Sequence, residues 1–177
     1  MTKLIILDRD GVINHDSPNY IRSPEEWNPI PGSLEAIAQL NQAGYLVVVA
    51  TNQSAINRRM FSLDVLKAIH DKMTSMLESH GGYFDGIYYC PHRPDDNCTC
   101  RKPQPGMIQK ILSDFGIQPE EAIGVGDSYR DLEALQSAGC RAALVMTGNG
   151  KLVLQKHDVS DIPKFDNLSA FVEDFLK

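Results

Sequence analysis

Short apolar runs alternate with segments of helical periodicity along most of this 177-residue chain. The apolar runs predict buried strands at residues 3–8, 45–50, 84–89, 122–126 and 141–146. Apolar side chains three or four residues apart predict helices at residues 33–43, 62–80, 105–115, 130–138 and 168–176. Because strands that alternate with helices build βαβ units, we expect an α/β fold with a mostly parallel central sheet between two helical layers.

Two segments interrupt this alternation. Residues 12–32 contain four prolines and predict an irregular flap, while residues 90–100 are rich in turn-forming residues and predict a loop. Both segments are too short to form a cap domain of their own. We therefore expect a single domain over residues 1–177 with a minimal cap.

Polar side chains follow three of the predicted strands, at the point where each strand ends. Asp8 and Asp10 follow the first apolar run, Thr51 follows the second, and Asp127 follows the run at 122–126. Ligands of parallel α/β sheets bind beyond the carboxyl ends of the strands, near a change in strand order. We therefore expect these side chains to face one crevice.

These residue types suit a magnesium ion and a phosphoryl group. Asp8 and Asp10 are two residues apart, so an extended chain points both carboxylates the same way, and their repulsion favours a cation between them. Mg²⁺ binds carboxylate and phosphate oxygens, and Asp127 adds a third carboxylate. We predict a magnesium site formed by Asp8, Asp10 and Asp127.

With a phosphate ester bound at this edge, each polar residue has a predicted role. Asp8 would attack phosphorus and form an aspartyl-phosphate. Asp10 would protonate the leaving alkoxide and then activate the water that cleaves this intermediate. Thr51 and Lys102 would hold the equatorial phosphoryl oxygens, where the transferring group carries its charge. Asp131 is expected to complement the N-terminus of a helix and not to bind the metal.

A second cluster combines three of the four cysteines with a histidine. The pattern C-x-H-x5-C-x-C is formed by Cys90, His92, Cys98 and Cys100. Three thiolates and one imidazole make a closed structural Zn²⁺ site, and each pair is spaced so that both side chains face one point. We expect zinc to fix the loop that delivers Arg101 and Lys102. Cys140 is expected to be a buried residue at the entry of a strand.

Charge and hydropathy limit the partners of the chain. Seventeen Lys and Arg residues against 23 Asp and Glu residues give a formal net charge of −6, and an acidic chain is a poor candidate for holding nucleic acid by its overall field. No apolar stretch is long enough for a transmembrane helix, and the first apolar run is too short for a signal-peptide core. We expect a cytoplasmic protein without nucleic-acid or membrane partners, and nothing in the sequence requires more than a monomer.

Four motifs resemble those of the haloacid dehalogenase superfamily of phosphatases. They are Asp8-Arg9-Asp10-Gly11, Thr51-Asn52-Gln53-Ser54, Arg101-Lys102-Pro103 and Gly126-Asp127. The resemblance implies a three-layer, Rossmann-like sandwich, with Asp8 as nucleophile and Mg²⁺ ligand. It also implies Asp10 as general acid/base with its backbone carbonyl on the metal, Thr51 and Lys102 as phosphoryl-stabilising residues, and Asp127 as the residue that completes the metal site.

The zinc-binding loop narrows the resemblance to the D-glycero-D-manno-heptose-1,7-bisphosphate 7-phosphatases and the related histidinol-phosphatases. A small-molecule sugar phosphate is then the implied substrate, and removal of the 7-phosphate is the implied reaction. The implied substrate contacts are Asp16, Ser17, Pro18, Asn19, Thr51, Asn52, Gln53, Ser54, Arg101 and Lys102. In this chain, Ala55 and Arg59 stand at two positions where such families often have glycine.

Several alternatives remain open at the sequence level. Histidinol-phosphate hydrolysis would use the same scaffold, but its cationic product favours carboxylates, whereas Arg58, Arg59 and Arg101 favour a further anion. A non-catalytic, zinc-bearing binding protein would not need the intact set of acidic and phosphoryl-binding residues. A polynucleotide 3′-phosphatase is disfavoured by the acidic balance and the lack of a basic stripe.

Four further predictions concern single side chains. His70 and His80 are expected on the surface of the long helix at 62–80. Trp27 is expected to anchor the flap by packing. His15 adjoins the flap and is a candidate for contact with the substrate.

Overall fold

The computed structural model describes residues 1–177 and contains a six-stranded sheet in which all neighbouring strands are parallel. The strands are β1 (Leu4–Leu7), β2 (Leu46–Asn52), β3 (Gly86–Cys90), β4 (Ala122–Gly126), β5 (Arg141–Val145) and β6 (Lys164–Phe165). Their order is β3-β2-β1-β4-β5-β6, so the direction in which strands are added reverses between β1 and β4. Open α/β sheets bind their ligands at such a reversal.

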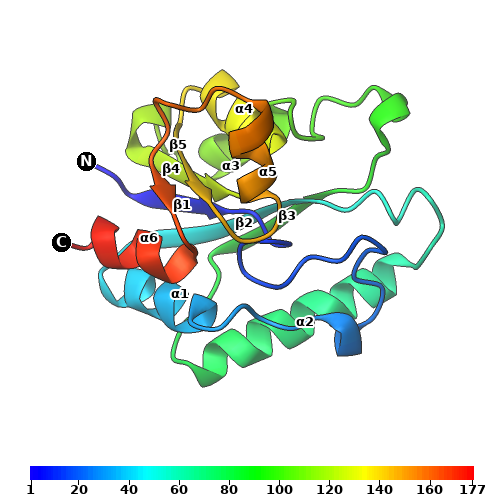
Figure 1. Ribbon diagram of the computed structural model, residues 1–177. Coiled ribbons are helices and arrows are strands. Elements are labelled where there is room, and N and C mark those ends of the chain that lie inside the picture. The colour runs from blue at the N-terminus through cyan, green and yellow to red at the C-terminus, as the bar shows by residue number, and fades with distance from the viewer.

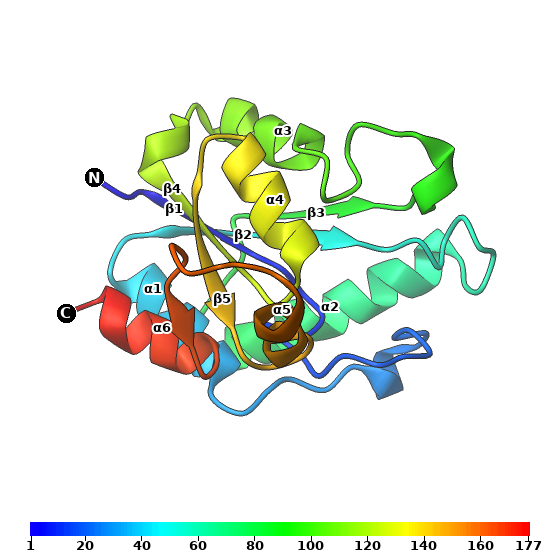
Figure 2. The same ribbon diagram turned by 45° about the horizontal axis from the view of Figure 1, so that its top comes forward.

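Helices cover both faces of the sheet, as Figures 1 and 2 show. One face carries α1 (Ser33–Gln42), α2 (Leu63–Ser79) and α6 (Leu168–Phe175). The other carries α3 (Gly106–Phe115), α4 (Tyr129–Ser137) and α5 (Gly150–Lys156). Short 3₁₀ helices lie at Pro24–Glu26, Pro94–Asp96 and Pro119–Glu121. None of these helices combines the length and apolar composition needed to cross a bilayer.

The sheet is buried on both sides, which explains the continuous apolar runs. In β1, Ile5 and Leu7 belong to the core beneath α1, α2 and α6, while Leu4 and Ile6 belong to the core beneath α3 and α4. Successive side chains of a strand point to opposite faces, so a strand covered twice needs apolar residues at every position. The predicted three-layer α/β fold is confirmed.

The predicted element positions agree closely with the structure; besides the three 3₁₀ helices, one short α-helix and one short strand were not predicted. All five predicted strands and all five predicted helices occur within one or two residues of their expected bounds. Ser62 caps α2 by accepting a hydrogen bond from the backbone N–H of Val65 (3.3 Å). Helix α5 and the two-residue strand β6 gave no recognisable periodicity because each is shorter than the window that reveals it.

The flap at 12–32 is held firmly against the core. Trp27 is fully buried, as the sequence predicted, and Val12, Ile13 and Ile21 join the same cluster. The Lys72 ammonium of α2 donates hydrogen bonds to two carbonyl oxygens of the flap, those of Pro24 and Trp27, at 2.7 Å each. The flap is therefore a fixed wall beside the carboxyl edge of the sheet.

Candidate active site

The loops that follow β1, β2, β3, β4 and β5 line a cavity of about 400 Å³ at the carboxyl edge of the sheet. The predicted site residues that line it are Asp8, Asp10, Asp16, Ser17, Pro18, Thr51, Asn52, Gln53, Ser54, Arg101, Lys102 and Asp127. Asn19 lies outside it, with His15, in a neighbouring hollow. Residues separated by more than 100 positions thus share one polar cavity, because parallel strands end at the same edge.

Three carboxylates meet on the floor of this cavity. Asp8, Asp127 and Asp131 each offer an oxygen atom, and these atoms lie within 4.8 Å of one another. Asp127 is fixed by two donors of Asn149, its backbone N–H at 2.8 Å and its side-chain amide at 3.1 Å from Oδ2. Gly11 lies directly against the same carboxylate, so a Cβ atom at this position would overlap Asp127. Its backbone has φ +85°, which also favours glycine.

The repulsion among these carboxylates favours the binding of a cation. Burial and the neighbouring Asp131 raise the pKa of Asp8 to about 7. Burial, Asp131 and Asp8 raise the pKa of Asp127 to about 8. In the absence of a metal these carboxyl groups therefore retain protons near neutrality. A divalent cation would offset the cost of ionising carboxyl groups that are buried and repel one another. The donor set is all oxygen and carries several charges, which fits Mg²⁺.

Lys102 supplies a buried positive charge to the same cluster. Its Nζ lies 3.0 Å from Asp8 Oδ1 and 2.7 Å from Asp131 Oδ1, and it donates to the carbonyl oxygen of Ala50 at 2.7 Å. Burial alone would lower the pKa of Lys102, but Asp131 and Asp8 outweigh it and raise that pKa well above its ordinary value. The side chain of Asn52 pairs with the backbone N–H and carbonyl of Lys102, which fixes the lysine opposite Asp8.

Asp131 has two roles in the structure. Its carboxylate accepts hydrogen bonds from the backbone N–H (3.0 Å) and hydroxyl (2.8 Å) of Ser128 at the start of α4, as its predicted capping role requires. It also forms the ion pair with Lys102, which the sequence did not indicate. Asp131 is thus a link between the helix and the charged cluster.

Asp10 lines the cavity, but its carboxylate is bound by a separate set of partners. The Arg9 guanidinium donates to both of its oxygens, from Nε at 2.9 Å and from a terminal nitrogen at 3.1 Å. Asn14 (2.9 Å) and Gln53 (3.2 Å) donate further hydrogen bonds. Burial alone would raise the pKa of Asp10, but Arg9 and the two amides outweigh it and hold that pKa below its ordinary value.

The prediction that His70 lies on the surface is wrong. His70 is only 8% exposed, and its Nε2 lies 3.1 Å from a terminal nitrogen of Arg9. A signal for this burial was present, because His70 falls on the same helical stripe as Leu66, Ile69 and Met73. His80, at the end of the same helix, is exposed as predicted.

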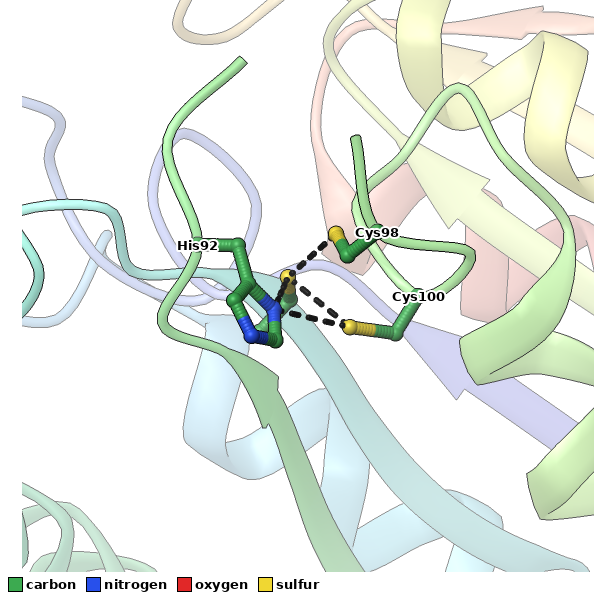
Figure 3. A group of neighbouring side chains, drawn as sticks. His92, Cys98 and Cys100 are labelled. Atoms are coloured by element: carbon green, nitrogen blue, oxygen red, sulfur yellow. Dashed lines mark hydrogen bonds between the residues drawn. The ribbon is translucent and has the colours of Figure 1, made fainter. Parts of the chain in front are cut away.

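The four predicted zinc ligands converge on one point, where the side chains of His92, Cys98 and Cys100 turn toward one another (Figure 3). His92 Nδ1 lies 3.3 Å from both Cys90 Sγ and Cys100 Sγ, and Cys90 Sγ lies 3.6 Å from Cys98 Sγ. Separations of this size suit a four-coordinate ion with S₃N ligands. Cys140 is buried and stands apart from this cluster, as predicted.

Basic side chains surround the mouth of the cavity. Arg58, Arg101 and Arg130 all line it, and none of them forms an ion pair with a carboxylate of the chain. Burial, followed by the charges of Arg130 and Arg58, lowers the pKa of Arg101, which places the three cations near one another. Arg130 escaped the sequence analysis because a lone arginine in the first turn of a helix carries no distinguishing pattern. Arg59 does not line the cavity.

Comparisons with known proteins give a consistent picture. A family profile described as haloacid dehalogenase-like hydrolase matches residues 19–139. The chain is 49% identical over 173 residues to D-glycero-beta-D-manno-heptose-1,7-bisphosphate 7-phosphatase of Neisseria meningitidis serogroup A, covering 96% of this chain and 92% of that protein.

Two solved structures are similar over almost the whole chain. The crystal structure of D,D-heptose 1,7-bisphosphate phosphatase from Bordetella bronchiseptica, complexed with magnesium and phosphate, is 48% identical, with a TM-score of 0.96 and coverage of 99% of this chain and 98% of that one. The D,D-heptose 1,7-bisphosphate phosphatase from Burkholderia thailandensis is 43% identical, with a TM-score of 0.79 and coverage of 99% of both chains.

Proposed function

The chain belongs to the haloacid dehalogenase-like hydrolase family, and from this premise we propose that it removes the 7-phosphate of D-glycero-D-manno-heptose 1,7-bisphosphate in a Mg²⁺-dependent reaction. The observation that carries the phosphatase chemistry is the meeting of Asp8, Asp127 and Lys102 at the carboxyl edge of the sheet. The substrate is proposed because the similar proteins bear that name and because the mouth of the cavity is basic.

In this proposal Asp8 and Asp127 hold Mg²⁺, with the backbone carbonyl of Asp10 as a further ligand. The bound ion would offset the repulsion between the Asp8 carboxylate and an incoming phosphate. A carboxylate oxygen of Asp8 attacks phosphorus, the bond to the sugar oxygen breaks, and an aspartyl-phosphate forms. The Lys102 ammonium and the Thr51 hydroxyl bind the equatorial oxygens during this transfer.

Asp10 then has to work in two protonation states. In the free protein its low pKa keeps it as a carboxylate, the form that takes a proton from the water that cleaves the aspartyl-phosphate. For the first step it must carry a proton to the leaving alkoxide. An anionic phosphoryl group beside it raises its pKa, so substrate binding favours that proton.

The three arginines at the cavity mouth favour a substrate with a second phosphate. Arg58, Arg101 and Arg130 have no carboxylate partner of their own, so a second anion would neutralise a cluster that otherwise repels itself. Histidinol phosphate places a cation in that position and would meet repulsion. We therefore favour the bisphosphate over histidinol phosphate.

We further propose that Cys90, His92, Cys98 and Cys100 hold a structural Zn²⁺ ion. The loop they form contains few apolar residues, so a metal would take the place of a core. Arg101 follows the last ligand directly, and its backbone N–H lies 3.3 Å from Cys98 Sγ. The metal would therefore fix the starting point of the segment that carries Arg101 and Lys102.

A comparison of two substrates tests this function. With Mg²⁺ present, we expect kcat/KM for heptose 1,7-bisphosphate to exceed that for histidinol phosphate by at least about tenfold, since each lost or repulsive ionic contact costs about 1.4 kcal/mol or more. Asp8→Asn should lower the turnover of both substrates by at least about 10⁴-fold while the circular dichroism spectrum is retained. A higher kcat/KM for histidinol phosphate would overturn the substrate assignment, and an active Asp8→Asn variant would overturn the nucleophile.

A further inference from the structure

Arg9 is a fully buried cation whose guanidinium group has partners on two sides. One edge of its guanidinium donates to the two oxygens of Asp10, at 2.9 and 3.1 Å. Its remaining terminal nitrogen lies 3.1 Å from Nε2 of His70, on α2. Guanidinium nitrogens only donate, so Nε2 accepts this hydrogen bond and His70 is neutral with its proton on Nδ1.

The second contact decides how the guanidinium is oriented. A planar guanidinium held only by Asp10 could tilt together with that carboxylate, whereas a second partner on another element fixes its plane. Helix α2 is a firm support, because Ile69 and Met73 on either side of His70 are fully buried in the core. Burial and Arg9 lower the pKa of His70 to about 4, so the imidazole stays an acceptor at neutral pH.

We propose that His70 is a positioning residue of the phosphatase reaction, which holds the Arg9 guanidinium in the plane that presents the Asp10 carboxyl group to the leaving oxygen. This inference rests on the proposed function, in which Asp10 is the general acid/base. His70 does not touch the substrate, since it does not line the cavity. Its effect passes through Arg9 and is expected in the rate of the chemical steps.

Two amide substitutions separate positioning from packing. The side-chain amide of Gln reaches the place of Nε2 and can accept from Arg9, whereas that of Asn is one methylene shorter and cannot. We expect His70→Asn to lower kcat for heptose 1,7-bisphosphate by about 10- to 100-fold with KM within about twofold, because a misplaced acid/base group loses part of its contribution. His70→Gln should stay within about threefold of the unsubstituted protein, and the exposed control His80→Gln should not change kcat.

A second substrate isolates the proton that Asp10 donates. Acetate leaves acetyl phosphate without needing a proton, so in single-turnover measurements His70→Asn should slow release of the sugar far more than release of acetate. The proposal would be overturned if His70→Asn and His70→Gln lost equal amounts of kcat, or if only KM changed. It would also be overturned if His70→Asn slowed the release of the sugar and of acetate equally. A protein that hydrolyses no phosphate ester with Mg²⁺ would instead overturn the proposed function.

The tautomer of His70 can be measured in the unsubstituted protein, so this test does not depend on whether a variant folds. In ¹⁵N NMR spectra of the unsubstituted protein at neutral pH, we expect a neutral ring with Nδ1 protonated and Nε2 free to accept. An imidazolium ion, or a ring protonated on Nε2, is incompatible with the hydrogen bond from Arg9 and would overturn the inference.

Discussion

At the scale of single residues, two buried cations pair with three of the four carboxylates at the floor of the cavity. Arg9 binds Asp10, and Lys102 binds Asp8 and Asp131. Against the effect of burial, Arg9 lowers the pKa of Asp10, whereas burial and Asp131 raise the pKa of Asp8 even though Lys102 opposes them. Such divergence between neighbouring carboxyl groups is typical of groups with different roles. Asp127 pairs with neither cation, and in the proposed function Mg²⁺ would offset its charge.

Arg59 adopts a backbone conformation that is unfavourable for a residue with a side chain. It stands where similar families often have glycine, and its backbone adopts φ +56° in the structure. Left-handed backbone costs an L-residue about 1–2 kcal/mol, of which the greater chain entropy of unfolded glycine cancels part. We expect Arg59→Gly to raise the free energy of unfolding by about 0.5–1 kcal/mol.

Urea unfolding checks this, with Arg59→Ala as the control. The Arg59 side chain is exposed and makes no hydrogen bond, so Ala removes it while keeping a Cβ in the left-handed region. Arg59→Ala should therefore leave stability nearly unchanged. If Ala and Gly stabilise equally, the cause is the arginine side chain and not the backbone.

At the scale of elements, the loop at 90–100 depends on its side-chain cluster more than on packing. Cys90, at the end of β3, is the only fully buried residue of this segment. The loop nevertheless precedes Lys102, whose ammonium must reach Asp8 across the edge of the sheet. A metal at the cluster would thus connect the order of one loop to the geometry of the reaction centre.

Cys98→Ser tests this connection. Because a hydroxyl is a much poorer zinc ligand than a thiolate, we expect about one zinc per chain in the unsubstituted protein and loss of that zinc in the variant. Activity should fall by at least about tenfold, since metal-ligand and supporting contacts typically change activity by 10- to 100-fold. Cys140→Ala, which removes a thiol outside the cluster, should retain its zinc; full activity in zinc-free protein contradicts the coupling.

At the scale of the whole molecule, the buried charges make stability depend on pH. In the metal-free folded protein the pKa of Asp8 is raised to about 7 and that of Asp127 to about 8, against 3.8 for an ordinary aspartate. Between pH 3.8 and these values, the folded state binds more protons than the unfolded state. Stability from these groups is therefore lost as pH rises. His70 affects stability in the opposite direction. Folding lowers its pKa from 6.5 to about 4, so its contribution to stability increases as the pH rises from about 4 to 6.5 and is constant above that.

A net loss of stability is thus expected from about pH 4 to about pH 8, and it is steepest near pH 6.5 to 7, where His70 no longer offsets it and folded Asp8 still holds its proton. Thermal unfolding in magnesium-free buffer, without chelator so that the loop at 90–100 is undisturbed, should give a Tm that falls across this window. Added Mg²⁺ should raise Tm more at pH 8 than at pH 6, since it binds the ionised carboxylates. Asp127→Asn should flatten the fall, and a Tm that rises over the window would contradict this assignment of charges.

The sequence alone determined the layers of the fold and the edge at which the site lies. Strands covered on both faces must be apolar at every position, and the residues directly after such strands must emerge together, so Asp8, Thr51 and Asp127 could be placed in one crevice without coordinates. The ligand cluster at 90–100 could likewise be predicted, because the spacing of its cysteines and histidine is local. These features depend on short stretches of chain.

Only the tertiary structure decided which charged groups face one another. His70 lies 61 residues from Arg9, and Lys102 lies 94 residues from Asp8, and no local pattern states that they are partners. The same holds for Arg130, which reaches the cavity because α4 begins at its rim. Side-chain direction and burial at long range set these pairings, and with them the pKa differences on which the proposed chemistry depends.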